Sequence, residues 1–395
     1  MQRPPQSHAA TLPDGTASGD VSLSIAPDVR LAVPAVPPPL MAPTYRFDRT
    51  FEQNAAEGPA FSGPYVDVPA TPMKDFLGHR VASRIGIAAS LLVNERWFEL
   101  YSRLGFDLLT YKTIRSRERL AHPLPNWLYL DESSVSTSNA ATPLHATDTI
   151  SPAPLTATAA GSIGMSSSPP EVWRRDIRNC RARLRPGQVL IVSVVGTADA
   201  GTSEAAFIDD FSALTAEARE AGAQVVELNF SCPNVGRRES EVYRDAEAAA
   251  RIARAARAAA GPVPLLVKIG PIKERERMAG LLRRLSGLVD GVVMINAPSR
   301  AIVDAAGAPA FGANRARAGM MGGAVFDIAV RCVRNAVDIV GRDDLGLHVL
   351  AVGGVCSPER ISAFFDAGAY AVLAASACAF DPYLAVRAKH HDPML

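Results

Sequence analysis

Short apolar runs alternate with amphipathic segments along most of this sequence, from about residue 85 to the C-terminus. The runs are rich in Val, Ile, Leu and Ala and are bounded by glycine, proline or polar residues, which is the pattern of short buried strands. Eight runs share these features and span residues 85–89, 108–112, 190–195, 225–230, 265–269, 291–296, 348–353 and 370–375. Because such runs imply a parallel sheet buried on both faces, eight of them separated by helices predict a (β/α)8 TIM barrel.

The segments between the runs carry the spacing of amphipathic helices. One begins after Asn94, a good N-cap residue, and ends at Gly105. Further helices are predicted over residues 203–221, 246–259, 274–285, 323–340 and 357–366, and a last one begins near Pro382. A doubly wound Rossmann sheet would also alternate strands and helices, but no G-x-G-x-x-G motif opens the first helix here.

Two regions interrupt the pattern. Residues 1–43 are rich in Pro, Ala, Ser and Gly, which predicts a disordered or extended leader before a barrel domain over residues 44–395. Residues 131–160 are rich in Ser, Thr, Ala and Pro and show no periodicity. A loop of this length is typically functional or disordered, so we expect an excursion above the barrel mouth, either a lid or a mobile insertion without a role.

Composition and charge narrow the class of protein. With 41 Lys and Arg against 40 Asp and Glu, the net charge is +1 and no basic run stands out, so we expect no nucleic-acid partner. The five cysteines are scattered and form neither a disulfide framework nor a C-x-x-C motif, and no metal-binding motif is found. No apolar run approaches the roughly 20 residues of a membrane span, and no secretory signal is recognised. These features predict a soluble protein of a reducing cytoplasm.

The most informative motif is the stretch VVELNFSCPN at residues 225–234. It begins as a buried strand and ends with Asn229, Cys232 and Asn234, where a TIM barrel places its active site. A thiol flanked by two amides could take a proton while the amides hold a planar polar substrate. The alternative is a buried cysteine beside two asparagines that cap a turn.

Other strand ends carry polar or small residues that would converge with this motif. Lys112 and Lys268 lie within apolar strands, where an unpaired lysine is rarely buried. Each could pair with a core carboxylate, or both could serve an active site. Gly353-Gly354 and Ala375-Ser376 follow the seventh and eighth strands, where barrels commonly bind a phosphate through backbone N–H groups. A lysine near a flavin would stabilise the negative charge that builds up at N1 and O2 on reduction.

Over residues 45–395 the chain resembles the dihydroorotate dehydrogenase family of FMN-dependent barrels. The stretches that carry the resemblance are ELNFSCPNV, TYKT at 110–113, VKIGP at 267–271, the strand end at Asn296, RAGMMGG at 317–323 and AVGGV at 351–355. The resemblance is to the soluble class that uses a cysteine base, and it also implies a homodimer.

The resemblance implies a role for each matching residue. Cys232 would take the proton next to a carbonyl, FMN N5 would take the hydride from the neighbouring carbon, and Lys112 would support the reaction. Substrate-binding residues would be Asn229, Asn234, Asn296 and Ala297. Residues in contact with FMN would be Ala88, Ala89, Ser90, Lys112, Lys268, Asn296, Gly322, Gly353, Gly354, Ala375 and Ser376.

Two positions depart from the family pattern. Gly161 begins a segment that commonly reads Asn-Ser-x-Gly, and Ala297 stands where Ser or Thr usually follows the asparagine. Losing two polar contacts would weaken binding of the original ligand by several kcal/mol. We therefore expect an oxidoreductase for a CH–CH bond beside a carbonyl, acting on dihydroorotate or on a related cyclic amide or specialised metabolite.

Two alternatives to this function are a genuine dihydroorotate dehydrogenase of pyrimidine biosynthesis and a catalytically idle barrel with a binding role. The second is disfavoured because an idle barrel has no need of Cys232 together with both lysines. The electron acceptor is not identified by the sequence, which shows neither an iron–sulfur cysteine cluster nor the N-terminal amphipathic helix of the quinone-using class.

Overall fold

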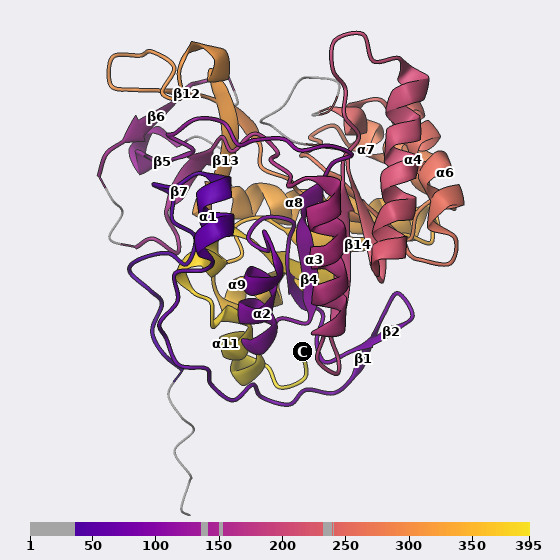
Figure 1. Cartoon of the computed structure of the whole chain (residues 1–395), viewed down its shortest axis with the longest axis horizontal. Coiled ribbons are helices and arrows are strands. Elements are labelled where there is room, and N and C mark those ends of the chain that lie inside the picture. The colour runs from indigo at the N-terminus through magenta and orange to yellow at the C-terminus, as the bar shows by residue number, and fades with distance from the viewer. Residues whose placement is uncertain (1–35, 136–140, 150–152, 232–238, 240) are drawn as a thin grey trace, which may run out of the picture. The chain divides into compact units, whose positions relative to one another are not determined.

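The computed structural model describes residues 36–135, 141–149, 153–231, 239 and 241–395. Within them, eight parallel strands close into a barrel (Figure 1). In the order in which they pair around the barrel, the strands are β3 (Ile85–Ile87), β4 (Leu108–Ile114), β8 (Val189–Val194), β9 (Val225–Asn229), β10 (Leu265–Ile269), β11 (Gly291–Met294), β14 (His348–Val352) and β15 (Ala371–Ala374). The predicted TIM barrel and all eight predicted strands are confirmed.

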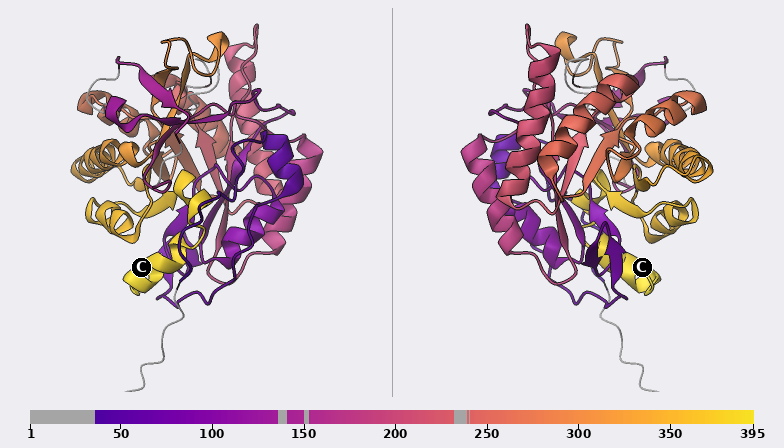
Figure 2. Two further views of the ribbon diagram at one scale, coloured as in Figure 1. Left: turned by 90° about the vertical axis from the view of Figure 1, so that its left-hand side faces the viewer. Right: turned by 90° about the vertical axis from the view of Figure 1, so that its right-hand side faces the viewer.

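Helices surround the barrel as an outer ring (Figure 2). They include α2 (Glu95–Arg103), α3 (Pro170–Ala182), α4 (Glu204–Ala221), α6 (Ala246–Ala260), α7 (Arg275–Leu285), α8 (Phe326–Arg342), α9 (Pro358–Asp366), α10 (Ser376–Phe380) and α11 (Leu384–His391). Asn94 caps α2 as predicted, because its side chain accepts from the backbone N–H groups of Arg96 and Trp97. Helix α3 was not predicted, and the predicted start of α8 at Gly323 is a short 3-10 turn.

The apolar core has two parts, one outside and one inside the barrel. The larger part fills the space between strands and helices. The smaller part lies inside the barrel, where Val189, Ile191 and Val225 pack together with Phe76 and Val81. The last two belong to a hairpin formed by β1 (Lys74–Phe76) and β2 (His79–Val81), which therefore closes the N-terminal end of the barrel and leaves the opposite end for the site.

A second, smaller sheet, whose five strands close into a ring, packs beside the barrel mouth (Figure 1). Its strands are β5 (Trp127–Leu130), β6 (Leu144–Thr147), β7 (Thr158–Gly161), β12 (Ser299–Val303) and β13 (Arg317–Gly322). The expectation that residues 131–160 lack regular structure is wrong for the described part of that segment. Its strands are only four residues long and are made of small and polar residues, so they leave no recognisable period.

The chain enters this domain earlier than its composition suggests. The backbone N–H groups of Leu40 and Thr44 donate to the carbonyls of Phe380 and Ala379, at 2.6 and 2.7 Å. Residues from Val36 onward therefore belong to the same compact unit as the barrel. Among the described residues, none of the helices combines the length and the apolar character that crossing a membrane requires.

Candidate active site

Successive side chains of a strand point to opposite faces of the sheet, and this alternation determines which polar side chains point into the barrel. Val225, Leu266 and Ile191 belong to the interior cluster. Residues two positions further along a strand share that face, so Glu227, Lys268 and Ser193 also point inward, and Asn229 follows Glu227 in the same direction. The polar side chains of β8, β9 and β10 thus stand above the apolar interior, toward the open end of the barrel.

A register shift in β4 brings two neighbouring side chains to the same cavity. The pairing of β4 with β8 is irregular between Tyr111 and Ile114, and such a bulge re-aims side chains next to active sites. Lys112 and Thr113 accordingly both line the cavity. The ammonium group of Lys112 donates to the carbonyl of Ser166 at 3.2 Å.

Two adjoining hollows at the barrel mouth, of about 170 and 120 Å³, form the candidate site. Every predicted site residue that the structure describes lines one or both of them, namely Ala88, Ala89, Ser90, Lys112, Asn229, Lys268, Asn296, Ala297, Gly322, Gly353, Gly354, Ala375 and Ser376. The predicted base Cys232 and the predicted substrate ligand Asn234 lie outside the described residues. The sequence reasoning thus selected residues that the fold brings together.

Lys268 is the charged group at the centre of this arrangement. It lines both hollows, and only 5% of its surface is exposed. No hydrogen-bond or ion-pair partner for its ammonium group is found within the part of the chain that the structure describes. A buried ammonium is costly without a partner, so this side chain is suited to an anionic or strongly polar ligand in the cavity.

Two asparagines are held rigidly at the edge of the site. The Asn229 side chain donates to Thr113 Oγ1 at 3.3 Å and accepts from the N–H of Ser231 at 3.2 Å. Asn296 donates through Nδ2 to the carbonyl of Ser231 and accepts from the N–H of Ala297 at 2.9 Å. Both amides are therefore oriented before any ligand binds.

The smaller hollow has the features of a phosphate site. Gly354 has a φ of 68°, and a Cβ there would be 2.7 Å from the backbone nitrogen of Phe326, so only glycine fits. Phe326 begins α8, whose N-terminus has no side-chain cap, and N–H groups at a helix start attract anions. Arg360 donates to the carbonyls of Gly323 and Gly354 at 3.3 and 2.7 Å and joins the two loops.

Aromatic and sulfur-containing side chains form the opposite wall of the larger hollow. Phe47 stacks on Trp127 with ring centres 3.9 Å apart, and both line the cavity. Met321 lies against Gly161 so closely that a Cβ at position 161 would overlap its Cε. The sequence reasoning missed Phe47, Trp127 and Met321 as site residues, although it singled out Gly161 and the stretch that contains Met321.

Buried contacts hold both chain ends that flank residues 232–238. Before this segment, Asn296 binds the carbonyl of Ser231. After it, Glu239 forms an ion pair with Arg115 at 2.7 Å and accepts from the N–H of Ala198 at the same distance. The residues on either side of the segment that carries Cys232, Ser231 and Glu239, are therefore held in place by buried contacts.

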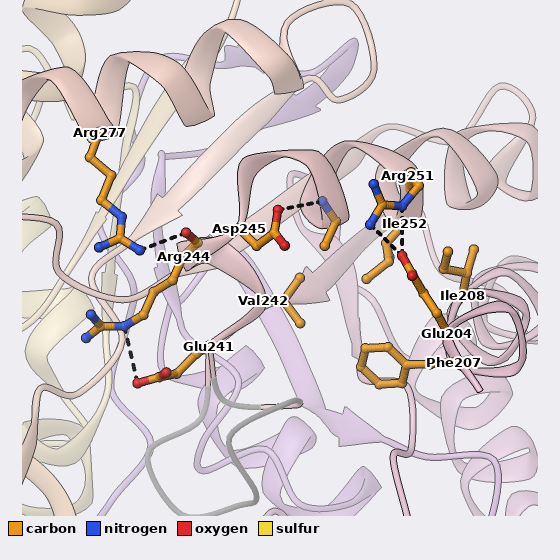
Figure 3. A pocket seen from close by; sticks show the side chains of 11 residues that line it. Glu204, Phe207, Ile208, Glu241, Val242, Arg244, Asp245, Arg251, Ile252 and Arg277 are labelled. Carbon is orange, nitrogen blue, oxygen red and sulfur yellow. Dashed lines mark hydrogen bonds and ion pairs between the residues drawn. The ribbon is translucent and has the colours of Figure 1, made fainter. Parts of the chain in front are cut away.

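A larger hollow of about 750 Å³ is lined by residues at the starts of α4, α6 and α7, and it shares no lining residue with the two hollows of the candidate site (Figure 3). Its charged groups pair with each other: Arg251 with Glu204 at 2.5 Å, and Arg244 with Glu241 at 3.3 Å. Arg277 donates to the carbonyl of Arg244 at 2.8 Å. These exposed pairs satisfy one another, so size alone does not make this groove a catalytic site.

Comparison with known proteins gives a consistent result. The family model described as dihydroorotate dehydrogenase matches residues 158–391. Dihydroorotate dehydrogenase of Dictyostelium discoideum is 34% identical over 363 residues, which cover 88% of this chain and 97% of that protein. The catalytic subunit of the NAD(+)-dependent dihydroorotate dehydrogenase B of Anoxybacillus flavithermus is 32% identical over 160 residues, 40% of this chain and 48% of the relative.

The fold agrees with solved structures of the same kind. The crystal structure of dihydroorotate dehydrogenase from Eimeria tenella in complex with ferulenol superposes with a TM-score of 0.67 at 18% identity, covering 90% of this chain and 92% of that one. At this identity the superposition supports the fold, while the sequence matches support the family. The chain therefore belongs to the dihydroorotate dehydrogenase family.

Proposed function

We propose that this protein is an FMN-dependent oxidoreductase that acts on a CH–CH bond next to a carbonyl group. The observation that carries the proposal is the buried Lys268 ammonium, which has no hydrogen-bond or ion-pair partner among the described residues and lines both hollows. One hollow offers the amides of Asn229 and Asn296, and the other offers the small residues around Gly354.

The described residues fit a bound FMN. Gly353, Gly354 and Ser376, with the start of α8, would hold the phosphate, and Ala88, Ala89, Ser90 and Gly322 would line the same cradle. Lys268 and Lys112 would approach the polar edge of the ring system. When bound, FMN supplies a hydride acceptor at N5, and a nearby ammonium stabilises the negative charge that follows.

The substrate would lose a proton from the carbon next to its carbonyl and a hydride from the neighbouring carbon, which leaves a carbon–carbon double bond. Cys232 is proposed as the base for the proton, since its position in the sequence follows Ser231 directly. A free thiol has a pKa near 8.5, so nearby cations or dipoles need to lower it only modestly. Asn229, Asn296 and Asn234 would hold the amide and carboxylate edges of the substrate.

Dihydroorotate is the first substrate to test, because the Dictyostelium relative named for this activity matches nearly along its whole length. A less polar cyclic amide is the second candidate. It is favoured by the apolar wall, where Met321 covers Gly161, and by the missing hydroxyl at Ala297. A wall of this kind leaves the polar edge of dihydroorotate without partners on that side, which a hydrogen-bonded ligand tolerates poorly.

Anaerobic mixing of the FMN-loaded protein with each substrate tests both the reaction and the substrate. Bleaching of the flavin spectrum by dihydroorotate, with loss of bleaching in C232A, would support a genuine dihydroorotate dehydrogenase. Bleaching by dihydrouracil derivatives with apolar substituents, and not by dihydroorotate, would support the second candidate. A C356A variant, which removes a buried thiol outside the predicted catalytic set, is the matched control. Unchanged bleaching in C232A would contradict the proposed base.

The idle-barrel alternative predicts that no member of such a panel reduces the flavin although dithionite does. A homodimer, which the family resemblance implies, belongs to the same proposal, and light scattering of the purified protein tests it.

A further inference from the structure

Glu227 is a fully buried carboxylate inside the barrel, with no exposed surface. Along β9 it shares the inward face with Val225, which belongs to the apolar interior, and with Asn229, which lines the cavity. Glu227 therefore lies between the apolar interior and the cavity, one layer below Asn229.

Its neighbours on the adjacent strands are few and identifiable. Ser193 on β8 pairs with Glu227 at the same level of the sheet. On β10, Lys268 pairs with Asn229, one inward-facing position further along the strand than Glu227. Hydrogen bonds connect Ser193 to the cavity. The Ser193 hydroxyl lies 3.0 Å from that of Thr113, and Thr113 accepts a hydrogen bond from the Asn229 side chain. Polar side chains therefore lie in succession between Glu227 and the cavity.

The carboxyl group of Glu227 is not satisfied by hydrogen bonds. Neither oxygen forms a hydrogen bond of good distance and angle within the described chain, although the Ser193 hydroxyl is near enough to act on the carboxyl group. Burial raises the pKa of Glu227, while the charge of Lys268 and the hydroxyl of Ser193 act in the opposite direction. Among the described residues, Lys268 and Ser193 are the polar groups that act on Glu227, and Lys268 is the charged one.

A buried acid without well-formed hydrogen bonds is destabilising, and a leucine of similar volume would fill the same space at a lower cost. Packing therefore does not account for Glu227. The one charged group that acts on it is Lys268, whose ammonium has no other partner in the described part of the chain. The two opposite charges therefore attract each other across the barrel interior.

We propose that Glu227 is a positioning residue that acts through Lys268, and that its charge offsets part of the lysine's field and so sets the reduction potential of the bound flavin. This inference rests on the proposed function. The sign follows from electrostatics: a carboxylate below Lys268 disfavours the negative charge of the reduced cofactor, so removing it raises the potential. Because such coupling is reciprocal, reduction of the flavin also favours protonation of Glu227.

The test compares the flavin reduction potentials of the FMN-loaded wild type and E227Q, equilibrated with a redox dye at about pH 8.5, a pH well above the ordinary range of a glutamate. We expect E227Q to shift the equilibrium toward the reduced flavin by about tenfold, which is about 30 mV for a two-electron couple. T110V is the matched control, because the Thr110 hydroxyl is also buried and without a partner among the described residues but carries no charge. Its potential should stay at the wild-type value.

A cycle with K268Q tests whether Glu227 acts through the lysine. The shift caused by E227Q should vanish in the K268Q background, because without the lysine's charge burial favours the neutral form of Glu227. If E227Q fails to fold, E227D replaces it, and retracting the carboxylate should raise the potential by a smaller amount.

Equal potentials in wild type, E227Q and E227D would overturn the inference and leave the proposed function intact. An equal shift in T110V would also overturn it, because a general disturbance of the interior would then suffice. Failure of the wild type to bind FMN would instead overturn the proposed function.

Discussion

Arg115 and Glu239 form an ion pair in the protein interior, with Nη2 of the arginine 2.7 Å from Oε2 of the glutamate. The two side chains are 0% and 3% exposed. Arg115 directly follows β4, the strand that carries Lys112, and also donates to the carbonyl of Met165 at 3.1 Å. The pair therefore joins the lysine strand to the chain that returns from the segment containing Cys232.

Replacing one member of this pair should destabilise the fold strongly. R115L would leave the Glu239 carboxylate buried without its main partner, at a cost of about 3–5 kcal/mol in the free energy of unfolding. Chemical denaturation measures this cost. The double variant R115L/E239L should recover a large part of it, because no charge is then left unpaired. A single-variant cost below about 1 kcal/mol, the size of an exposed pair, would contradict the buried pair.

Restoring an asparagine at position 161 should depend on Met321. G161N alone would push its side chain into the Met321 thioether, so binding in the cavity should weaken. The double variant G161N/M321A removes the overlap and adds an amide. We expect it to bind dihydroorotate about tenfold more tightly than G161N, since one added hydrogen bond is worth about 1 kcal/mol or more. Perturbation of the flavin spectrum measures both affinities, and equal affinities would contradict the proposed contact.

Gly354 should be intolerant of any side chain. Alanine there would require a φ of 68° and would place its Cβ 2.7 Å from the backbone of Phe326. G346A is the matched control, because Gly346 has a similar φ of 65° but no atom near its missing Cβ. Both variants should lose about 1–2 kcal/mol of stability from the backbone conformation, and G354A should lose more because of its overlap with Phe326. Only G354A should also lose FMN affinity, which fluorescence titration measures.

Lys268 should contribute directly to cofactor affinity. A charge-assisted hydrogen bond is worth about 1.5–3 kcal/mol, so K268Q should weaken FMN binding about tenfold or more. Lys273 is exposed and follows β10, the strand that carries Lys268. It provides the control K273Q, which should bind FMN as the wild type does. Equal losses in both variants would point to a general effect of charge and not to a contact of Lys268.

Glu227 should also change how the free energy of unfolding depends on pH. Its pKa is raised in the folded protein by burial, so the folded state holds the proton more tightly than the unfolded state does. The associated stability is present at low pH and is lost as the pH rises from the ordinary glutamate pKa through the raised one. E227Q should therefore gain stability relative to the wild type as the pH rises above the ordinary pKa of a glutamate. A difference that is constant with pH would contradict the raised pKa.

The strands of the barrel were predictable because their buried residues form uninterrupted apolar runs, and the site residues because they interrupt those runs. Lys112 and Lys268 were visible as charges where packing alone calls for apolar side chains. The second sheet was not predictable, since strands such as Thr158–Gly161 carry neither a long apolar run nor an alternation. The contact between Phe47 and Trp127 joins residues far apart in the sequence, and a single sequence carries no signal for such pairs.

The central claim is that the cavity at the barrel mouth holds FMN, and titration of the purified, flavin-free protein with FMN tests it most directly. We expect stoichiometric binding, with a flavin spectrum that differs from that of free FMN, and weaker binding in K268Q and G354A than in K273Q and G346A. Absence of FMN binding by the folded wild-type protein would contradict the account.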